Sequence, residues 1–349
     1  MKTTTPAVAT NRDLFLDALA CRPTPRRPLW VMRQAGRYLP EYRALREKHS
    51  FEQLSGNAEL AAEVTLQPLA RFPLDAAIIF ADLMSPVGAL GLEVTFAPGP
   101  VLAQPVRTAA DVAALRRPAR GEIAPSVMQA LRIVRGELAG RQALLGFAGS
   151  PWSIAAYLVQ GRSSPGFPAL RTMAVANPEV LDALLTRLTD LIIDYVHAQF
   201  EAGADAIQLF DTWAGLLSHD AWSRVVRPHI ARFLDETRGT GRARILFVQD
   251  ASHLVHGYAA LASEALAVDW REDLAALRRA VGHTKALQGN LDPAVLVAGP
   301  AATAVAARAL LASVPARGHI VTLGHGITPD APIDSVHALV DAVHAEGAS

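Results

Sequence analysis

Eight short apolar runs, each followed by a small or polar residue and then a helical stretch, constrain the fold of this chain most. The runs are 28–32, 76–81, 143–148, 206–210, 244–248, 265–269, 285–288 and 319–323. Most of them carry Val, Ile, Leu or Phe without alternation, which is typical of strands covered on both faces. Helices are expected between them, over 57–71, 124–140, 177–203, 218–238, 301–313 and 333–346. The pattern predicts an α/β fold, a single (β/α)8 barrel.

A doubly wound open sheet is the competing fold. It needs a crevice where the strand order reverses, and no glycine-rich dinucleotide or phosphate motif follows the first apolar run. The segment 91–103 predicts an extra hairpin between the second and third units. Asn57 and Asn177 are expected to cap two helices, with Pro178 in the first turn of the second.

The length of 349 residues suits one large barrel. Residues 1–11 lack the apolar core of a signal peptide and predict a flexible tail, so the barrel domain is expected to span 12–349. No window holds ~18 uninterrupted apolar residues, so no membrane span is expected. A cytoplasmic location is expected instead. The 33 basic residues balance 33 acidic ones, which favours neither a nucleic-acid partner nor a membrane surface.

Metal binding is not expected from this sequence. The single cysteine, Cys21, can form neither an intramolecular disulfide nor a thiolate-rich metal site. No histidine–carboxylate cluster has the spacing of a metal site either.

The chemistry of a barrel gathers on the loops that follow the strands. Reading just past the apolar runs gives a set rich in hydrogen-bond donors, which favours a polycarboxylate or phosphate ligand. Its main members are Arg33, Gln34, Arg37, Asp82, Tyr157, Thr212 and His325.

Several of these residues also have a purely structural interpretation. Asp82 and Thr212 are each as compatible with a helix cap as with a ligand contact, and Tyr157 has the spacing of a core residue beside Trp152. His325 stands between two glycines, which permit close approach of a ligand and argue against a core position.

Six blocks, in a fixed order, carry a resemblance to a known family. The run PLWVMRQAGRYLPEYR (28–43) resembles the first signature of the uroporphyrinogen decarboxylase family almost residue for residue, and GFAGSPWSIAAYLVQG (146–161) resembles the second. The other blocks are FPLDAAIIFADLM (72–84), IQLFDTWAG (207–215), LQGNLDP (287–293) and LGHGITPD (323–330). The similarity runs from about residue 12 to about residue 346.

The resemblance implies a cofactor-free carboxy-lyase that works as a homodimer. Its substrate would be uroporphyrinogen III, whose four acetate side chains become the methyls of coproporphyrinogen III on the haem route. The resemblance also implies the residues that contact substrate, with catalytic roles for Asp82, Arg33 and Arg37. The implied contacts are Arg33, Gln34, Ala35, Gly36, Arg37, Asp82, Tyr157, Thr212 and His325.

One region departs from the family pattern. The run VQDASHLVHGY (248–258) replaces the usual small-residue loop, and 262–270 lacks the usual glycine. This departure concerns the shape of the local loop and not the main signatures.

Two other functions stay open: a zinc-dependent methyltransferase of the same barrel superfamily, for which Cys21 alone supplies too few ligands, and a non-catalytic tetrapyrrole-binding protein.

Overall fold

A computed structural model describes residues 10–97 and 99–348 of the chain. The predicted tail, 1–11, lies outside this part except for its last two residues. Thr10 caps helix α1 (Asn11–Leu19) by accepting a hydrogen bond from the Asp13 backbone N–H, and Asn11 begins the helix. Helix α1 packs against the sheet at β1, β4 and β9.

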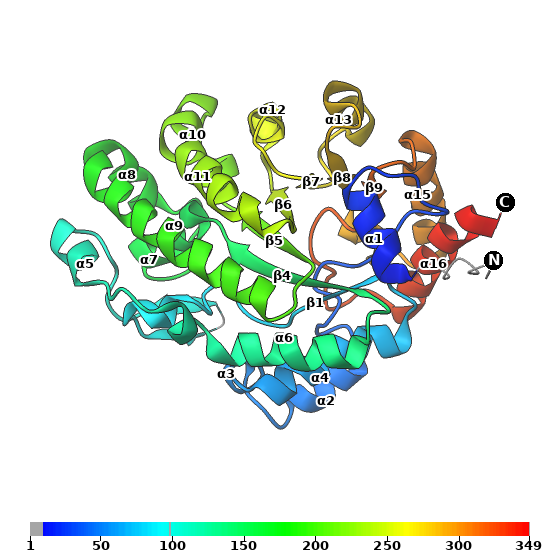
Figure 1. Cartoon of the computed structure of the whole chain (residues 1–349), viewed down its shortest axis with the longest axis horizontal. Helices are drawn as coiled ribbons and strands as arrows, with labels where there is room; N and C mark the ends of the chain where they lie inside the picture. Colours follow the sequence, from blue (N-terminus) through cyan, green and yellow to red (C-terminus); the bar gives the residue numbers. More distant parts are fainter. Residues whose placement is uncertain (1–9, 98, 349) are drawn as a thin grey trace, which may run out of the picture.

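The core of the molecule is a curled, parallel, seven-stranded sheet (Figure 1). Its strands are β1 (Ala76–Ile78), β4 (Ala143–Gly149), β5 (Ala206–Asp211), β6 (Ala243–Val248), β7 (Ala265–Val268), β8 (Ala286–Gln288) and β9 (His319–Ile320). Neighbouring strands follow one another in sequence order, from β1 to β9. Because the order never reverses, the doubly wound alternative is wrong for this part of the chain.

Helices cover the outer side of the curled sheet (Figure 1). Those not yet named are α2 (Pro40–Arg46), α3 (Phe51–Gly56), α4 (Ala58–Arg71), α5 (Ala109–Ala114), α6 (Pro125–Leu138), α7 (Pro151–Gln160), α8 (Pro168–Ala176), α9 (Pro178–Glu201), α10 (His219–Val225), α11 (Arg227–Thr237), α12 (Val255–Ala259), α13 (Leu274–Val281), α14 (Pro293–Val297), α15 (Pro300–Ser313) and α16 (Ile333–His344). Within the described residues, no helix is both long and apolar enough to cross a bilayer.

Five of the six predicted helices are confirmed as single helices: α4, α6, α9, α15 and α16. The sixth, 218–238, is wrong as one helix, because α10 and α11 meet at Val226. Pro228 lies in the first turn of α11 and has no N–H with which to continue α10. Asn57 caps α4 with a hydrogen bond from Leu60 N–H at 2.9 Å, whereas Asn177 precedes α9 without a side-chain bond.

The first apolar run, 28–32, forms one parallel bridge rather than a strand. Leu29 pairs with Val321, beyond β9, and accepts a hydrogen bond from the Asp75 N–H, just before β1. The pairing stops there because Val31 donates its N–H to the Gln34 side chain (3.0 Å) instead of to a neighbouring strand. Seven of the eight predicted strands are therefore confirmed, and the first run, 28–32, forms only this bridge.

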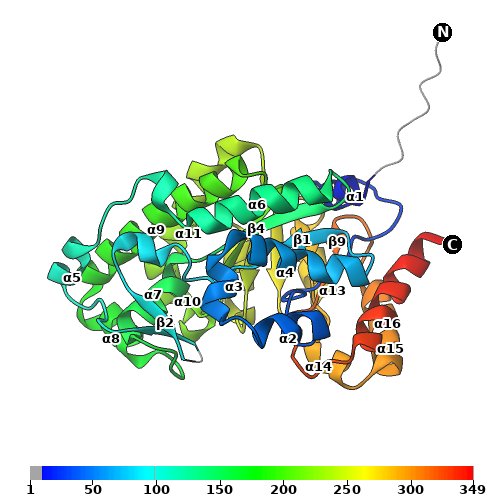
Figure 2. The same cartoon turned by 90° about the horizontal axis from the view of Figure 1, so that it is seen from below.

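The extra hairpin is also confirmed. Strand β2 (Val94–Phe96) pairs antiparallel with β3 (Pro100–Leu102), apart from the main sheet. The hairpin contacts α7 through β3, and α3, α4 and α6 pack together on one side of the molecule (Figure 2).

Two consecutive side-chain hydrogen bonds cross the buried interior of the sheet. The Trp30 indole N–H donates to Gln288 Oε1 (3.1 Å), and Gln288 Nε2 donates to Gln208 Oε1 (2.8 Å). All three side chains are fully buried. A buried polar group without a hydrogen bond costs free energy, so these two bonds fix the spacing between the first apolar run, β8 and β5.

Candidate active site

The loop that follows the first apolar run is a tight turn with unusual backbone angles. Arg33 has φ of 63°, which side chains other than glycine rarely adopt. A Cβ on Gly36 would lie 2.8 Å from the Arg33 carbonyl oxygen, so the turn needs glycine there. The result is that Arg33 and Arg37 both remain exposed on one short loop.

Gln34 differs from its neighbours in this loop, because its side chain is fully buried. Its Oε1 accepts from Val31 N–H at 3.0 Å, and its Nε2 donates to the Ala76 carbonyl at 3.0 Å. The side chain therefore fastens the loop to β1 and has no free surface. Ala35 and Gly36 are partly exposed.

Two glycines hold His325 between two walls. A Cβ on Gly326 would lie 2.2 Å from Arg33 Cδ and 2.8 Å from Arg33 Nε, so the Arg33 side chain lies directly over this residue. A Cβ on Gly324 would lie 2.3 Å from the backbone nitrogen of Trp270. His325 is thus flanked by Arg33 on one side and by the loop after β7 on the other.

Arg33 reaches solvent, but protein surrounds it on most sides. Burial lowers the pKa of its guanidinium below the ordinary value, and repulsion from Arg37 lowers it further. Attraction to Tyr157 and Asp82 opposes both effects. These interactions bring four of the predicted residues within electrostatic reach of one another.

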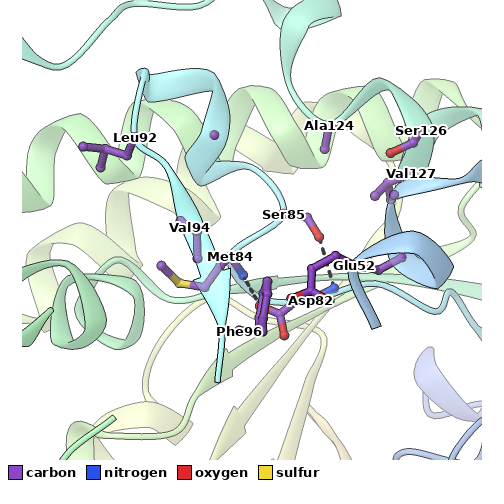
Figure 3. Close-up of a pocket in the computed structure, with 13 residues that line it drawn as sticks. Glu52, Asp82, Met84, Ser85, Leu92, Val94, Phe96, Ala124, Ser126 and Val127 are labelled. Atoms are coloured by element: carbon purple, nitrogen blue, oxygen red, sulfur yellow. Dashed lines mark hydrogen bonds between the residues drawn. The ribbon is translucent and has the colours of Figure 1, made fainter. Parts of the chain in front are cut away.

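Asp82 lies four residues beyond β1, in a turn that its own side chain organises (Figure 3). Its Oδ1 accepts from Met84 N–H at 2.8 Å, and its backbone N–H donates to Ser85 Oγ at 3.1 Å. It caps no α-helix, because the short 3-10 helix that follows begins at Val87 with Pro86 as its cap residue. Burial raises the pKa of Asp82, while the Met84 N–H and the Arg33 charge oppose that rise.

Tyr157 and Thr212 come from neighbouring units of the fold. Tyr157 lies in α7, partly exposed, with its ring 5.3 Å from Phe167 and 6.4 Å from Trp213. Burial raises the pKa of its phenol. Thr212 follows β5 and donates its backbone N–H to Ser153 Oγ at 2.9 Å, and the next 3-10 helix is capped by Trp213 instead.

His325 is uncharged at neutral pH. Burial, followed by the charge of Arg33, lowers its pKa to about 4, and Arg271 adds to this effect while Asp269 opposes it. A neutral imidazole carries one N–H donor and one acceptor nitrogen. His325 can therefore form a hydrogen bond with a carboxyl group without bringing a charge of its own.

Two cavities flank the predicted residues. One, of about 340 Å³, lies beside Asp82 between α3, the β2–β3 hairpin and the start of α6 (Figure 3). The other, of about 440 Å³, is lined by His325, Gly326 and Trp270 and has Asp292 and Asp330 in its wall. Arg33 lines neither cavity and lies within charge range of both Asp82 and His325.

The segment that departs from the family pattern supports the loop after β5. Tyr258 donates its hydroxyl to the buried carboxylate of Asp211, which also accepts from Ser150 Oγ and Ser153 Oγ. His253 Nε2 lies 2.7 Å from the Leu217 carbonyl oxygen. Through Ser153, this network holds the backbone of Thr212 in place.

Residues 10–346 of the chain match one family model, described as uroporphyrinogen decarboxylase. The chain belongs to the uroporphyrinogen decarboxylase family. All six sequence blocks that carry the resemblance lie inside the matched range.

Proteins named uroporphyrinogen decarboxylase are similar to this chain along nearly its whole length. The protein from Coxiella burnetii is 44% identical over 341 residues, which cover 95% of this chain and 94% of that protein. The protein from Geobacter metallireducens is 42% identical over 331 residues, with 95% and 97% covered. The protein from Hahella chejuensis is 44% identical over 342 residues and covers 96% of each chain.

Solved structures with the same fold include methyltransferases. A methyltransferase from Methanosarcina mazei superposes with a TM-score of 0.81 at 21% identity, over 97% of this chain and 99% of its own. A B12-independent methionine synthase from Shewanella superposes with a TM-score of 0.58 at 11% identity, over 93% and 94% of the two chains. At these identities the likeness concerns the fold alone. No three His, Cys, Asp or Glu side chains of residues 10–97 and 99–348 are grouped as metal ligands would be.

One charged group beside the uroporphyrinogen decarboxylase signatures was missed from the sequence. Arg271 follows β7 by three residues and acts electrostatically on His325. Trp270, which directly follows the run 265–269, has its ring centroid 6.5 Å from that of His325. Trp270 and Arg271 are the two residues that follow the run 265–269, so a search of the strand ends that includes these two positions identifies them.

Proposed function

We propose that this chain decarboxylates uroporphyrinogen III to coproporphyrinogen III, at a site bounded by the 33–37 loop, Asp82 and His325. Membership of the uroporphyrinogen decarboxylase family supports the reaction and its place in haem biosynthesis. The observation that supports the site is the electrostatic interaction of Arg33 with Asp82, Tyr157 and His325. These residues and Arg33 come from four separate parts of the sequence.

The arginines bind carboxylates in this proposal. Uroporphyrinogen carries eight carboxylates, and a guanidinium can hold one of them through two parallel hydrogen bonds. Arg33 and Arg37 lie on the same short loop, so together they bind two groups of the substrate or one group from two sides. Their mutual repulsion in the empty site is relieved when a carboxylate arrives between them.

The substrate supplies its own electron sink, so its chemistry requires no cofactor. A proton adds to the α-carbon of a pyrrole ring and makes the ring cationic. The acetate C–C bond then breaks, carbon dioxide leaves, and the electron pair flows into the ring to give an exocyclic methylene. A second proton converts this methylene into the methyl group, and the α-carbon then releases the proton that it gained, which restores the neutral pyrrole.

Asp82 stabilises the cationic ring in this proposal. Its carboxylate is partly desolvated, which raises its pKa and also strengthens its attraction to a nearby cation. The Met84 N–H holds the carboxylate in a fixed orientation, so little reorganisation is needed when the ring becomes positive. A charge pair at about 4 Å and an effective dielectric constant near 20 is worth about 4 kcal/mol.

Tyr157, Thr212 and His325 provide neutral hydrogen-bonding groups around the ring. His325 is uncharged because its pKa is about 4, so it donates an N–H to a substrate carboxylate. The Thr212 hydroxyl and the Tyr157 phenol do the same from the neighbouring units. Neutral donors place the substrate without cancelling the charge that Asp82 contributes.

The remaining features follow the family resemblance. We propose that 28–32 closes the curled sheet into an eight-membered barrel over 12–349 and that the site lies at the carboxyl ends of its strands. A homodimer and a cytoplasmic location complete the proposal. Light scattering on the purified protein tests the dimer, and a mass of about 37 kDa would contradict it, since one chain weighs 37.2 kDa.

Anaerobic incubation with uroporphyrinogen III tests the function. The protein is first stripped of metals, and the products are separated by carboxylate number after oxidation to porphyrins. Hepta- to tetracarboxylate porphyrins are the expected result. Unchanged substrate from a folded protein that binds it would refute the proposal and identify a tetrapyrrole-binding protein instead. Turnover that appears only after zinc is restored would contradict the cofactor-free chemistry.

A further inference from the structure

The loop after β7 presents an arginine in a fixed position beside His325. The Arg271 guanidinium lies 4.2 Å from the centroid of the Trp270 ring, and its Nη1 lies 2.9 Å from Asp269 Oδ2. Asp269 is buried and also accepts from the Arg271 and Asp250 backbone N–H groups. Stacking on an indole and bonding to a buried carboxylate both restrict a side chain that would otherwise sample many rotamers.

The guanidinium retains binding capacity that the protein does not use. Its side chain is 43% exposed, and among the described residues its Nη2 has no hydrogen-bond acceptor. Its Nε lies 3.6 Å from Asp250 Oδ1, which is too long for a hydrogen bond, and the Asp250 side chain is 71% exposed. An exposed pair of this kind contributes little to stability and separates readily.

The position of this arginine complements that of Arg33. The Asp269–Trp270 backbone packs against Gly324, and the Arg33 side chain packs against Gly326, so each of the two glycines that flank His325 contacts a segment that carries an arginine. Both of their charges lower the pKa of His325, after the larger effect of burial. The cavity lined by Trp270 and His325 also has Asp292 and Asp330 in its wall, and these two carboxylates repel substrate carboxylates from their part of it.

We propose that Arg271 is a specificity-determining residue that binds a carboxylate of the tetrapyrrole, with Asp250 as the partner that the substrate displaces. This inference rests on the proposed function and adds a second cationic segment, the loop after β7, to the arginines of the 33–37 loop. The bound carboxylate takes the Nη2 and Nε donors, and Asp269 and Trp270 keep the guanidinium in place. The side with Asp292 and Asp330 stays free of substrate carboxylates.

Opposite effects of two substitutions test the proposal. Binding of uroporphyrin I, an unreactive octacarboxylate, is measured by quenching of tryptophan fluorescence at several salt concentrations. Arg271→Gln is expected to weaken binding about tenfold or more and to reduce its salt dependence. Asp250→Asn removes the competing carboxylate, keeps the backbone bond to Asp269, and is expected to tighten binding about threefold. Asparagine tolerates the positive φ of residue 250 (50°).

Two further variants separate binding from folding. Arg232→Gln is the matched control, because Arg232 is 38% exposed, contacts Asp190 and Glu236, and lies on α11; it should bind normally. Arg271→Lys keeps the charge and should retain part of the affinity, even where the glutamine variant folds poorly. KM for uroporphyrinogen should rise in Arg271→Gln with a smaller change in kcat.

Several results would overturn the proposal. Normal uroporphyrin binding by Arg271→Gln refutes it, and so does a change in the same direction for Arg271→Gln and Asp250→Asn, which indicates a structural role for the pair. Because uroporphyrin does not react, the binding result is independent of turnover. A wild-type protein that binds uroporphyrin but leaves uroporphyrinogen unchanged refutes the proposed function and not this contact.

Discussion

Replacing Gly326 with alanine should displace Arg33 without removing its charge. The added methyl would lie 2.2 Å from Arg33 Cδ, 2.6 Å from Cγ and 2.8 Å from Nε, all shorter than any real carbon contact. The main chain at Arg33 cannot easily yield, because it is held in a left-handed turn with φ of 63°. The guanidinium must therefore swing away from His325 and toward solvent.

The size of the effect follows from the contact that is lost. One charge-assisted hydrogen bond between Arg33 and a substrate carboxylate is worth about 1.5–3 kcal/mol. At about 1.4 kcal/mol for each factor of ten, kcat/KM for uroporphyrinogen should fall by roughly 10- to 150-fold. The melting temperature should change little, since the displaced side chain already reaches solvent.

The assay is a double-mutant cycle in kcat/KM with Arg33→Ala as the second change. If the methyl acts through Arg33, Gly326→Ala should have almost no further effect once the arginine is absent. Gly136→Ala, in the last turn of α6 where nothing lies within 4 Å of the new methyl, is the matched control and should leave activity unchanged. An equal loss in both backgrounds would refute the reasoning, because the methyl would then be acting on His325 or on the backbone.

Three further substitutions test other parts of the site and the core. Asp82→Asn keeps an acceptor for Met84 N–H, so the melting temperature should hold while kcat falls roughly a thousandfold; near-normal turnover would remove the electrostatic role. Arg37→Ala should chiefly raise KM, and an unchanged KM would argue against a carboxylate contact. His319 is fully buried with a pKa of about 3, so below about pH 6.5 the unfolded chain binds a proton at this residue and the native state does not. The free energy of unfolding should therefore drop by up to about 1.4 kcal/mol per pH unit as the pH falls from 6.5 toward 3, and urea titrations of His319→Gln should lack this part of the slope.

The buried strands were the most predictable part of the fold. The runs 143–148 and 206–210 became β4 and β5 within one residue, because a strand covered on both faces must be apolar throughout. The run 28–32 has the same composition but forms only a bridge, because Val31 donates its N–H to the Gln34 side chain, and the bridge partner, Val321, lies near the other end of the chain. Local composition carries no information about such a distant pairing.

The site was predictable where a residue type and its position agree. Arg33, Asp82 and His325 were expected together after three different strands, and in the structure the charge of Arg33 acts on both Asp82 and His325. Gln34 belongs to the same signature, yet its amide is used inside the protein. Arg271 was missed because its role depends on Trp270 and Asp269 in three dimensions.

The bridge between Leu29 and Val321 has a consequence for the order of events during synthesis. The loop that carries Arg33 is fastened from the far end of the chain: Val321 N–H donates to the Pro28 carbonyl at 2.9 Å, and Ile327 N–H donates to the Met32 carbonyl at 2.9 Å. A ribosome adding about 5–20 residues each second makes those partners on the order of 15–60 seconds after Leu29. The first signature to be translated is thus among the last to be fixed in place, and a nascent chain stalled before residue 319 would have its sheet largely paired and its arginine loop unfastened.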